Sequence, residues 1–91
     1  MFAKHYDRFN DAINAHGLSA DRAEHESVLY HESRMYELAK EYVRRLDELT
    51  SREVDDYLRF MRHHVCAVLA YVGLSADPDP IMFEMLDVQS E

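Results

Sequence analysis

Among residue types that bind metals or transfer protons, histidine stands out in this sequence. Six of the 91 residues are histidines, and there is one cysteine, Cys66. His63 lies three residues before Cys66, so on an α-helix the two side chains would share one face and could chelate a metal ion. A structural zinc site needs four ligands, and the others would have to come from His5, His16 or His31. We predict no cofactor and no metal centre, with His63 and Cys66 as weak candidates.

Cys66 could alternatively act as a nucleophile with His63 as its base. That chemistry needs an oxyanion hole and a cleft. The sequence has only two glycines, and both stand where helices are expected to end, which leaves little loop to build a cleft. The spacings His-Glu-x-x-His and Glu-x-x-His, which hold zinc and di-iron centres, do not occur. We therefore predict that the protein is not an enzyme, and that Cys66 packs as a small apolar side chain.

The stretch from residue 54 to residue 72 carries the clearest helical pattern. Apolar residues recur at steps of three and four, which is one face of an α-helix: Val54, Leu58, Met61, Val65, Val68 and Val72. A neighbouring face of the same helix carries Phe60, His64, Ala67 and Tyr71. Residues 65–72 include no charged residue, so this half of the helix should be covered on all sides, by its own chain or by a partner.

Helix boundaries follow from capping residues. Thr50 and Glu53 fit a capping box that starts a helix over residues 51–72. Gly73 is expected to end that helix in the left-handed conformation, and Gly17 is expected to end an earlier helix in the same way.

Three further helices are predicted, over residues 2–16, 20–49 and 80–88. Ser19 or Asp21 is expected to cap the second of these, with Asp21 and Glu24 resembling a capping box, and Asp79 with Pro80 is expected to start the last. The sequence therefore predicts one all-α domain over residues 1–91, a small helical bundle of three main helices plus a short C-terminal helix.

The length of the second helix favours a symmetric homodimer. A helix over residues 20–49 would be about 45 Å long, whereas a compact domain of this size has a radius of gyration of about 12 Å. The helix and its successor would form a long central hairpin that either kinks or protrudes and packs on a second subunit, and we favour the second. The predicted dimer interface consists of Val28, Met35, Leu38, Tyr42, Cys66 and Ala70.

Charge and composition exclude several classes of protein. The net charge is −8, and no basic cluster stands free of acidic residues, so nucleic acid and anionic membranes are not expected as partners. No run of residues is apolar enough to be a signal peptide or to span a bilayer. One cysteine excludes an intrachain disulfide framework. A cytoplasmic location is expected.

The surplus of aromatic and soft apolar residues favours binding to another protein. Tyrosine is enriched at protein interfaces, and methionine-rich surfaces adapt to varied partners. The predicted partner-binding residues are Tyr30, Tyr36, Met82, Phe83 and Leu86. The tyrosines could equally line the edge of the core, and the last helix could simply cover the bundle.

The first functional hypothesis is a small acidic protein-binding regulator, of adaptor, inhibitor or anti-activator type, that acts by occupying a partner's surface. Two alternatives stay open: a histidine-based metal-binding or metal-sensing helical protein, and an acidic mimic of nucleic acid.

Overall fold

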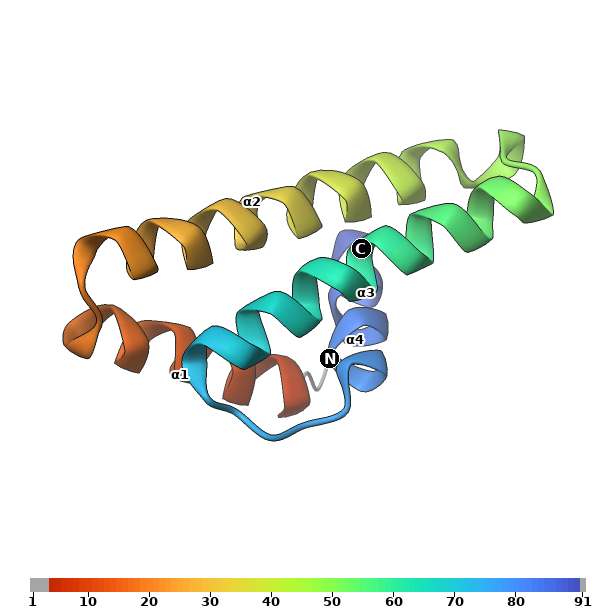
Figure 1. The fold of residues 1–91 in the computed structure, drawn as a ribbon. Helices are drawn as coiled ribbons and strands as arrows, with labels where there is room; N and C mark the ends of the chain where they lie inside the picture. Colours follow the sequence, from red (N-terminus) through yellow and green to blue (C-terminus); the bar gives the residue numbers. More distant parts are fainter. Residues whose placement is uncertain (1–3, 91) are drawn as a thin grey trace.

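The computed structural model describes residues 4–90, which form four α-helices and one short 3₁₀-helix (Figure 1). The helices are α1 (Lys4–Ser19), α2 (Arg22–Arg45), α3 (Ser51–Val72) and α4 (Pro78–Ser90), and the 3₁₀-helix η1 (Leu46–Glu48) follows α2 directly. The all-α prediction is confirmed, since no strand occurs in the described part of the chain.

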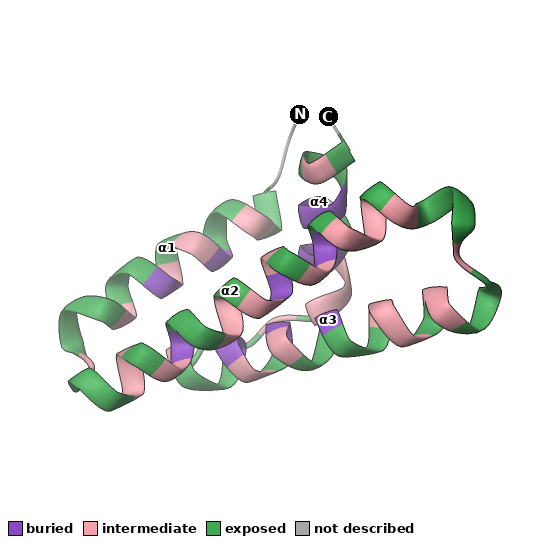
Figure 2. Ribbon diagram, turned by 90° about the horizontal axis from the view of Figure 1, so that it is seen from above, coloured by how far each residue is buried: buried purple, intermediate pink, exposed green. Residues whose placement is uncertain are grey.

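The long helices α2 and α3 lie side by side and antiparallel, and α1 and α4 pack on them (Figures 1 and 2). The end of the α2–α3 pair that carries η1 extends beyond α4 in both views. All four helices contribute to a single core. Its buried residues are Phe9, Ile13, Val28, Met35, Ala39, Met61, Val65, Val68, Leu69, Ile81, Met82, Met85 and Leu86.

Capping residues fix the start of α2 and both ends of α3. The Asp21 side chain accepts a hydrogen bond from the Glu24 backbone N–H, and Thr50 and Glu53 form the predicted reciprocal capping box. Gly73 ends α3 with φ of 70°, in the left-handed region. Each of these three predictions is confirmed, because the interactions lie within a few residues of one another.

Gly17 does not end α1, so that prediction is wrong. The helix continues to Ser19, and Gly73 is the only glycine with positive φ in the described part of the chain. Leu18, the residue that follows Gly17, is 92% exposed. The physical role of Gly17 is different. A Cβ at this position would lie 2.8 Å from Cε1 of His25, so glycine allows the His25 ring to pack against α1.

Two other helix boundaries differ from the prediction. The α-helical part of α2 ends at Arg45, because residues 46–48 tighten into a 3₁₀ turn before the next helix begins. The last helix starts at Pro78 rather than Pro80, and the Asp77 side chain accepts from the Asp79 N–H. A proline suits the first helical position at either site, so the sequence alone does not choose between them.

The second half of α3 is not covered on all sides by its own chain. Val65, Val68 and Leu69 face the core, whereas Cys66 and Ala70 are exposed. Cover by a partner on that side stays a prediction. No helix among residues 4–90 has the length and apolarity needed to cross a membrane.

Candidate functional site

Five ring side chains follow the seam between α2 and α3, and we name them the aromatic strip: Tyr30, His31, Phe60, His64 and Tyr71. Tyr30 and His31 come from α2 and the other three from α3. Tyr30 is 59% exposed, Phe60 55% and Tyr71 39%. Phe60, His64 and Tyr71 share one side of α3 because they are spaced four and seven residues apart. The strip therefore combines large aromatic surface with exposure to solvent.

The strip is tied across the two helices by a pair of histidines. The Nδ1 atoms of His31 and His64 lie 2.8 Å apart, at hydrogen-bond distance. The Tyr71 ring stacks on His31, with ring centroids 6.2 Å apart and planes inclined by 29°. Tyr30 meets both imidazoles edge-on, at centroid distances of 5.3 Å to His31 and 6.4 Å to His64. Both imidazoles are thus held by aromatic neighbours.

Both histidines of the pair are poor bases. Partial burial, followed by the positive charge of a protonated His63, lowers the pKa of His31. Partial burial also lowers the pKa of His64, and His31, His63 and Arg34 add repulsion. Each ring therefore resists protonation, which keeps one Nδ1 free to accept the hydrogen bond from the other.

A shallow hollow of about 380 Å³ continues the seam from Phe60 toward the η1 end of the helix pair. Its walls mix charges of both signs with apolar surface, and its lining residues are Arg34, Leu38, Glu41, Arg45, Glu53, Asp56, Tyr57 and Phe60. Arg45 donates to the Tyr57 hydroxyl at 3.1 Å and to Glu48 at 3.0 Å. Aromatic surface beside a charged hollow is an arrangement that suits a protein interface.

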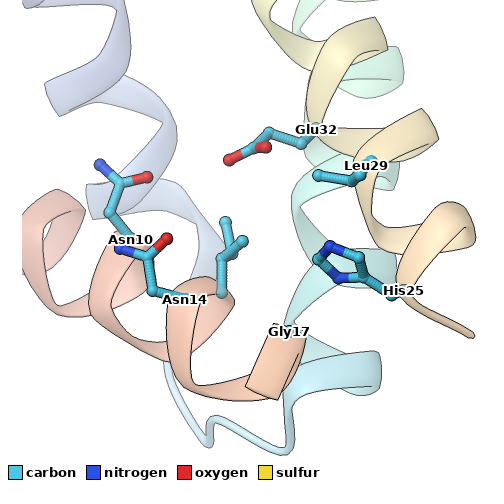
Figure 3. Close-up of a pocket in the computed structure, with 7 residues that line it drawn as sticks. Asn10, Asn14, Gly17, His25, Leu29 and Glu32 are labelled. Atoms are coloured by element: carbon cyan, nitrogen blue, oxygen red, sulfur yellow. The ribbon is translucent and has the colours of Figure 1, made fainter. Parts of the chain in front are cut away.

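A second cavity, of about 530 Å³, opens between α1 and α2 (Figure 3). The side chains of Asn10, Asn14, His25 and Glu32 surround it. Burial raises the pKa of Glu32, and the buried Nδ1 of His25 has no hydrogen-bond partner in the described part of the chain. These polar groups could bind a small polar molecule, although nothing among them forms a nucleophile with a base.

The structure places the predicted partner-binding residues in different environments. Met82 and Leu86 are buried in the core, because they form the face of α4 that packs on the other helices. Tyr36 is half-buried, and its hydroxyl accepts a hydrogen bond from the Tyr6 hydroxyl. Tyr36 therefore links α2 to α1, and its role in partner binding stays a prediction. Tyr30 and Phe83 are both exposed. Tyr30 belongs to the aromatic strip and is part of the proposal below, whereas the predicted binding role of Phe83 is untested, and the experiments below compare the two positions.

The residues predicted for a dimer interface fall into three groups. Val28 and Met35 are fully buried within the single chain, as part of the core to which all four helices contribute, so they are not available to a second subunit in this structure. Leu38 and Tyr42 are half-buried and pack against the same core. Only Cys66 and Ala70 are exposed, which leaves them as the surface on which a second subunit could approach.

The histidines do not assemble the metal site that the sequence left as a weak candidate. Among residues 4–90, no group of three or more His, Cys, Asp or Glu side chains is arranged to hold an ion. His63 and Cys66 are both exposed on α3, and His31 pairs with His64 rather than with them. The partner of His64 is likewise an imidazole and not a metal-binding group of another residue type.

Sequence reasoning missed Phe60 and Tyr71 as surface residues and missed the His31–His64 pair. The spacing of Phe60, His64 and Tyr71 was a usable signal, because it places them on one side of α3. Comparison with protein-family models, with curated proteins and with solved structures found no match for this chain. Functional inference therefore rests on the geometry described above.

Proposed function

We propose that this protein is a small acidic protein-binding regulator that acts by occupying a partner's surface with its aromatic strip. The observation that supports this proposal is the exposure of Tyr30, Phe60 and Tyr71 along one seam. Large aromatic side chains contribute much contact area at a low cost in side-chain entropy, and they dominate the binding energy of many interfaces.

The proposed occupant of the seam is a helix of the partner protein. Two antiparallel helices leave a straight groove between them, and a third helix can place an apolar stripe along such a groove. The rings of Tyr30 and Tyr71 would contact that stripe. The hollow beyond Phe60 would receive a side chain of the partner, and Arg34 and Asp56 on its walls would pair with the partner's polar groups.

The net charge of −8 favours a partner with a basic surface. Opposite charges raise the rate of encounter between two proteins, and this acceleration weakens as salt screens the charges. Binding should therefore slow as the salt concentration rises, mainly through the association rate.

Affinity capture with matched variants tests the proposal. Tagged wild-type protein and the variants Tyr30→Ala, Tyr71→Ala and Phe83→Ala are used to capture proteins from an extract of the native host, with quantification by mass spectrometry. Phe83→Ala is the matched control, since Phe83 is an exposed aromatic residue on α4, away from the seam. We expect one or a few proteins whose recovery falls about tenfold or more with each strip variant and is unchanged in the control.

Circular dichroism of each variant shows whether the fold is retained. Equal recovery by the wild type and by folded Tyr30→Ala and Tyr71→Ala variants would contradict the proposal. Equal losses in Phe83→Ala would point to a different surface.

The homodimer also remains a proposal. Cys66 and Ala70 are small and exposed on α3, so a helix of a second subunit could approach closely there. This surface lies on a different side of α3 from the strip, because residues 66 and 70 are out of phase with residues 60, 64 and 71. A dimer and a partner complex are therefore compatible.

A further inference from the structure

We propose that His31 and His64 form a binding site for a divalent transition-metal ion that prefers nitrogen ligands in square geometry, namely Cu²⁺ or Ni²⁺. The two imidazoles come from different helices, 33 residues apart in the sequence, and their Nδ1 atoms face one another at 2.8 Å. The inference concerns these two side chains and does not depend on the proposed partner binding.

The distance between the two nitrogens is compatible with a metal ion of square geometry. Metal–imidazole bonds are about 2.0–2.1 Å long, so two nitrogens on adjacent corners of a square around one ion lie about 2.8–3.0 Å apart. The observed 2.8 Å is at the lower end of this range. Two ligands of a tetrahedral zinc ion would lie about 3.3 Å apart. Square geometry is preferred by Cu²⁺ and Ni²⁺, and Cu²⁺ binds most tightly in the divalent series.

The protonation state of the pair suits a metal ion. Only the neutral imidazole is a ligand, and protons compete with the metal wherever the ring is readily protonated. The hydrogen bond between the two Nδ1 atoms itself requires at least one neutral imidazole, because two protonated rings would present two donors to each other. In the metal-free protein one Nδ1–H donates to the other Nδ1. On binding, that proton moves through water to Nε2 of its own ring, both Nδ1 lone pairs go to the metal, and no net proton is released.

The surroundings fix the two rings and leave the ion accessible. Tyr71 stacks on His31, and Tyr30 contacts both imidazoles, so the pair loses little freedom when it binds a metal. The nearby positive charge of Arg34 is compensated by an ion pair with Glu37 at 2.7 Å. No third protein ligand is in place among residues 4–90, so water would occupy the remaining positions of the ion.

The test is isothermal titration calorimetry, in which tag-free protein is titrated with NiCl₂ and with CuCl₂ in a non-chelating buffer. We expect one metal site per chain that depends on both histidines of the pair. His31→Gln and His64→Gln each remove the chelate and should weaken binding on the order of a hundredfold. His63→Gln is the matched control. It removes an exposed histidine whose ring centroid lies 5.3 Å from that of His64, and its effect on the affinity should be small beside that of His31→Gln or His64→Gln.

Equal affinity of His31→Gln and the wild type, or an equal loss in His63→Gln, would overturn the proposal, because both results assign the metal to adventitious surface histidines. A measurement on the unaltered protein protects the test against variants that fail to fold. Electron spin-echo spectroscopy of the one-equivalent Cu²⁺ complex should show two bound imidazoles, and a single one or none would overturn the assignment.

Discussion

The Nδ1 atoms of His31 and His64 lie 2.8 Å apart across the α2–α3 seam, although 33 residues separate them along the chain. This hydrogen bond requires at least one neutral imidazole, because two protonated rings would present two donors to each other. The pair therefore links the protonation of the protein to the contact between its two longest helices.

Acidification should destabilise the protein through this pair. The pKa values of His31 and His64 are lower in the folded chain than the ordinary value of 6.5, so the unfolded chain binds more protons. The contribution of this pair to the free energy of unfolding is thus fully present above about pH 6.5 and is lost as pH falls below that value, through the lowered pKa values of the folded state.

Urea unfolding at about pH 7.5, 6.5 and 5.5 measures this dependence. The double variant His31→Gln, His64→Gln should show a shallower decline than the wild type. Glu32 contributes a pH dependence of stability with the opposite sign, because its pKa is raised in the folded chain. Glu32 is present in both proteins, so its contribution cancels in the comparison. Parallel declines would show that other groups control the pH dependence.

Gly17 and His25 should be energetically coupled. Alanine stabilises a helix interior by about 1 kcal/mol relative to glycine, but at position 17 the new Cβ would meet the His25 ring at 2.8 Å. We expect Gly17→Ala to bring little or no gain in the wild type and a gain of about 1 kcal/mol in a His25→Ala background. Chemical denaturation of the four proteins of this cycle gives the coupling, and strict additivity would contradict the contact.

Tyr36→Phe should affect stability and leave partner binding intact. The change removes the acceptor of the Tyr6 hydroxyl, which costs about 1 kcal/mol. Tyr42→Phe is the matched control, because the Tyr42 ring contacts Tyr57 and its hydroxyl makes no hydrogen bond in the described part of the chain. Thermal and urea unfolding compare the two variants. A loss of capture by folded Tyr36→Phe would return Tyr36 to the partner surface.

The proposed homodimer predicts a solution mass of twice the 10.7 kDa of one chain. A long charged side chain at the exposed Ala70 would separate the subunits, so Ala70→Arg should have the mass of one chain by light scattering. Ser33→Arg, at an exposed site on α2, serves as the control for the added charge. A wild-type mass of 10.7 kDa at micromolar concentration would rule out the dimer.

Local sequence signals predicted the structure well where the relevant interaction is local. The Thr50–Glu53 capping box and the left-handed Gly73 were predictable because each depends on residues within one helical turn. The same local motif failed at Gly17. The pentapeptide Gly-Leu-Ser-Ala-Asp begins at both glycines, but packing against His25, eight residues later, allows α1 to continue through the first copy.

The candidate site was less predictable, because it depends on how two helices align. Periodicity placed Phe60, His64 and Tyr71 on one side of α3, but it carries no information on which turn of α2 they face. The 3₁₀ turn at residues 46–48 and the short link to Thr50 set that alignment and bring His31 opposite His64. The burial of Val28 and Met35 in the core of the single chain likewise depends on how the four helices pack, whereas the sequence analysis assigned both residues to a subunit interface.

The central claim, that the aromatic strip is the partner-binding surface, is tested most directly by site-specific photocross-linking. A photoreactive phenylalanine analogue replaces Tyr30 in one protein and Phe83 in another, since both positions are exposed, and each protein is irradiated in an extract of the native host. The proposal predicts a discrete heavier adduct from position 30 and none from position 83. No adduct from position 30, or the same adduct from both positions, would contradict it.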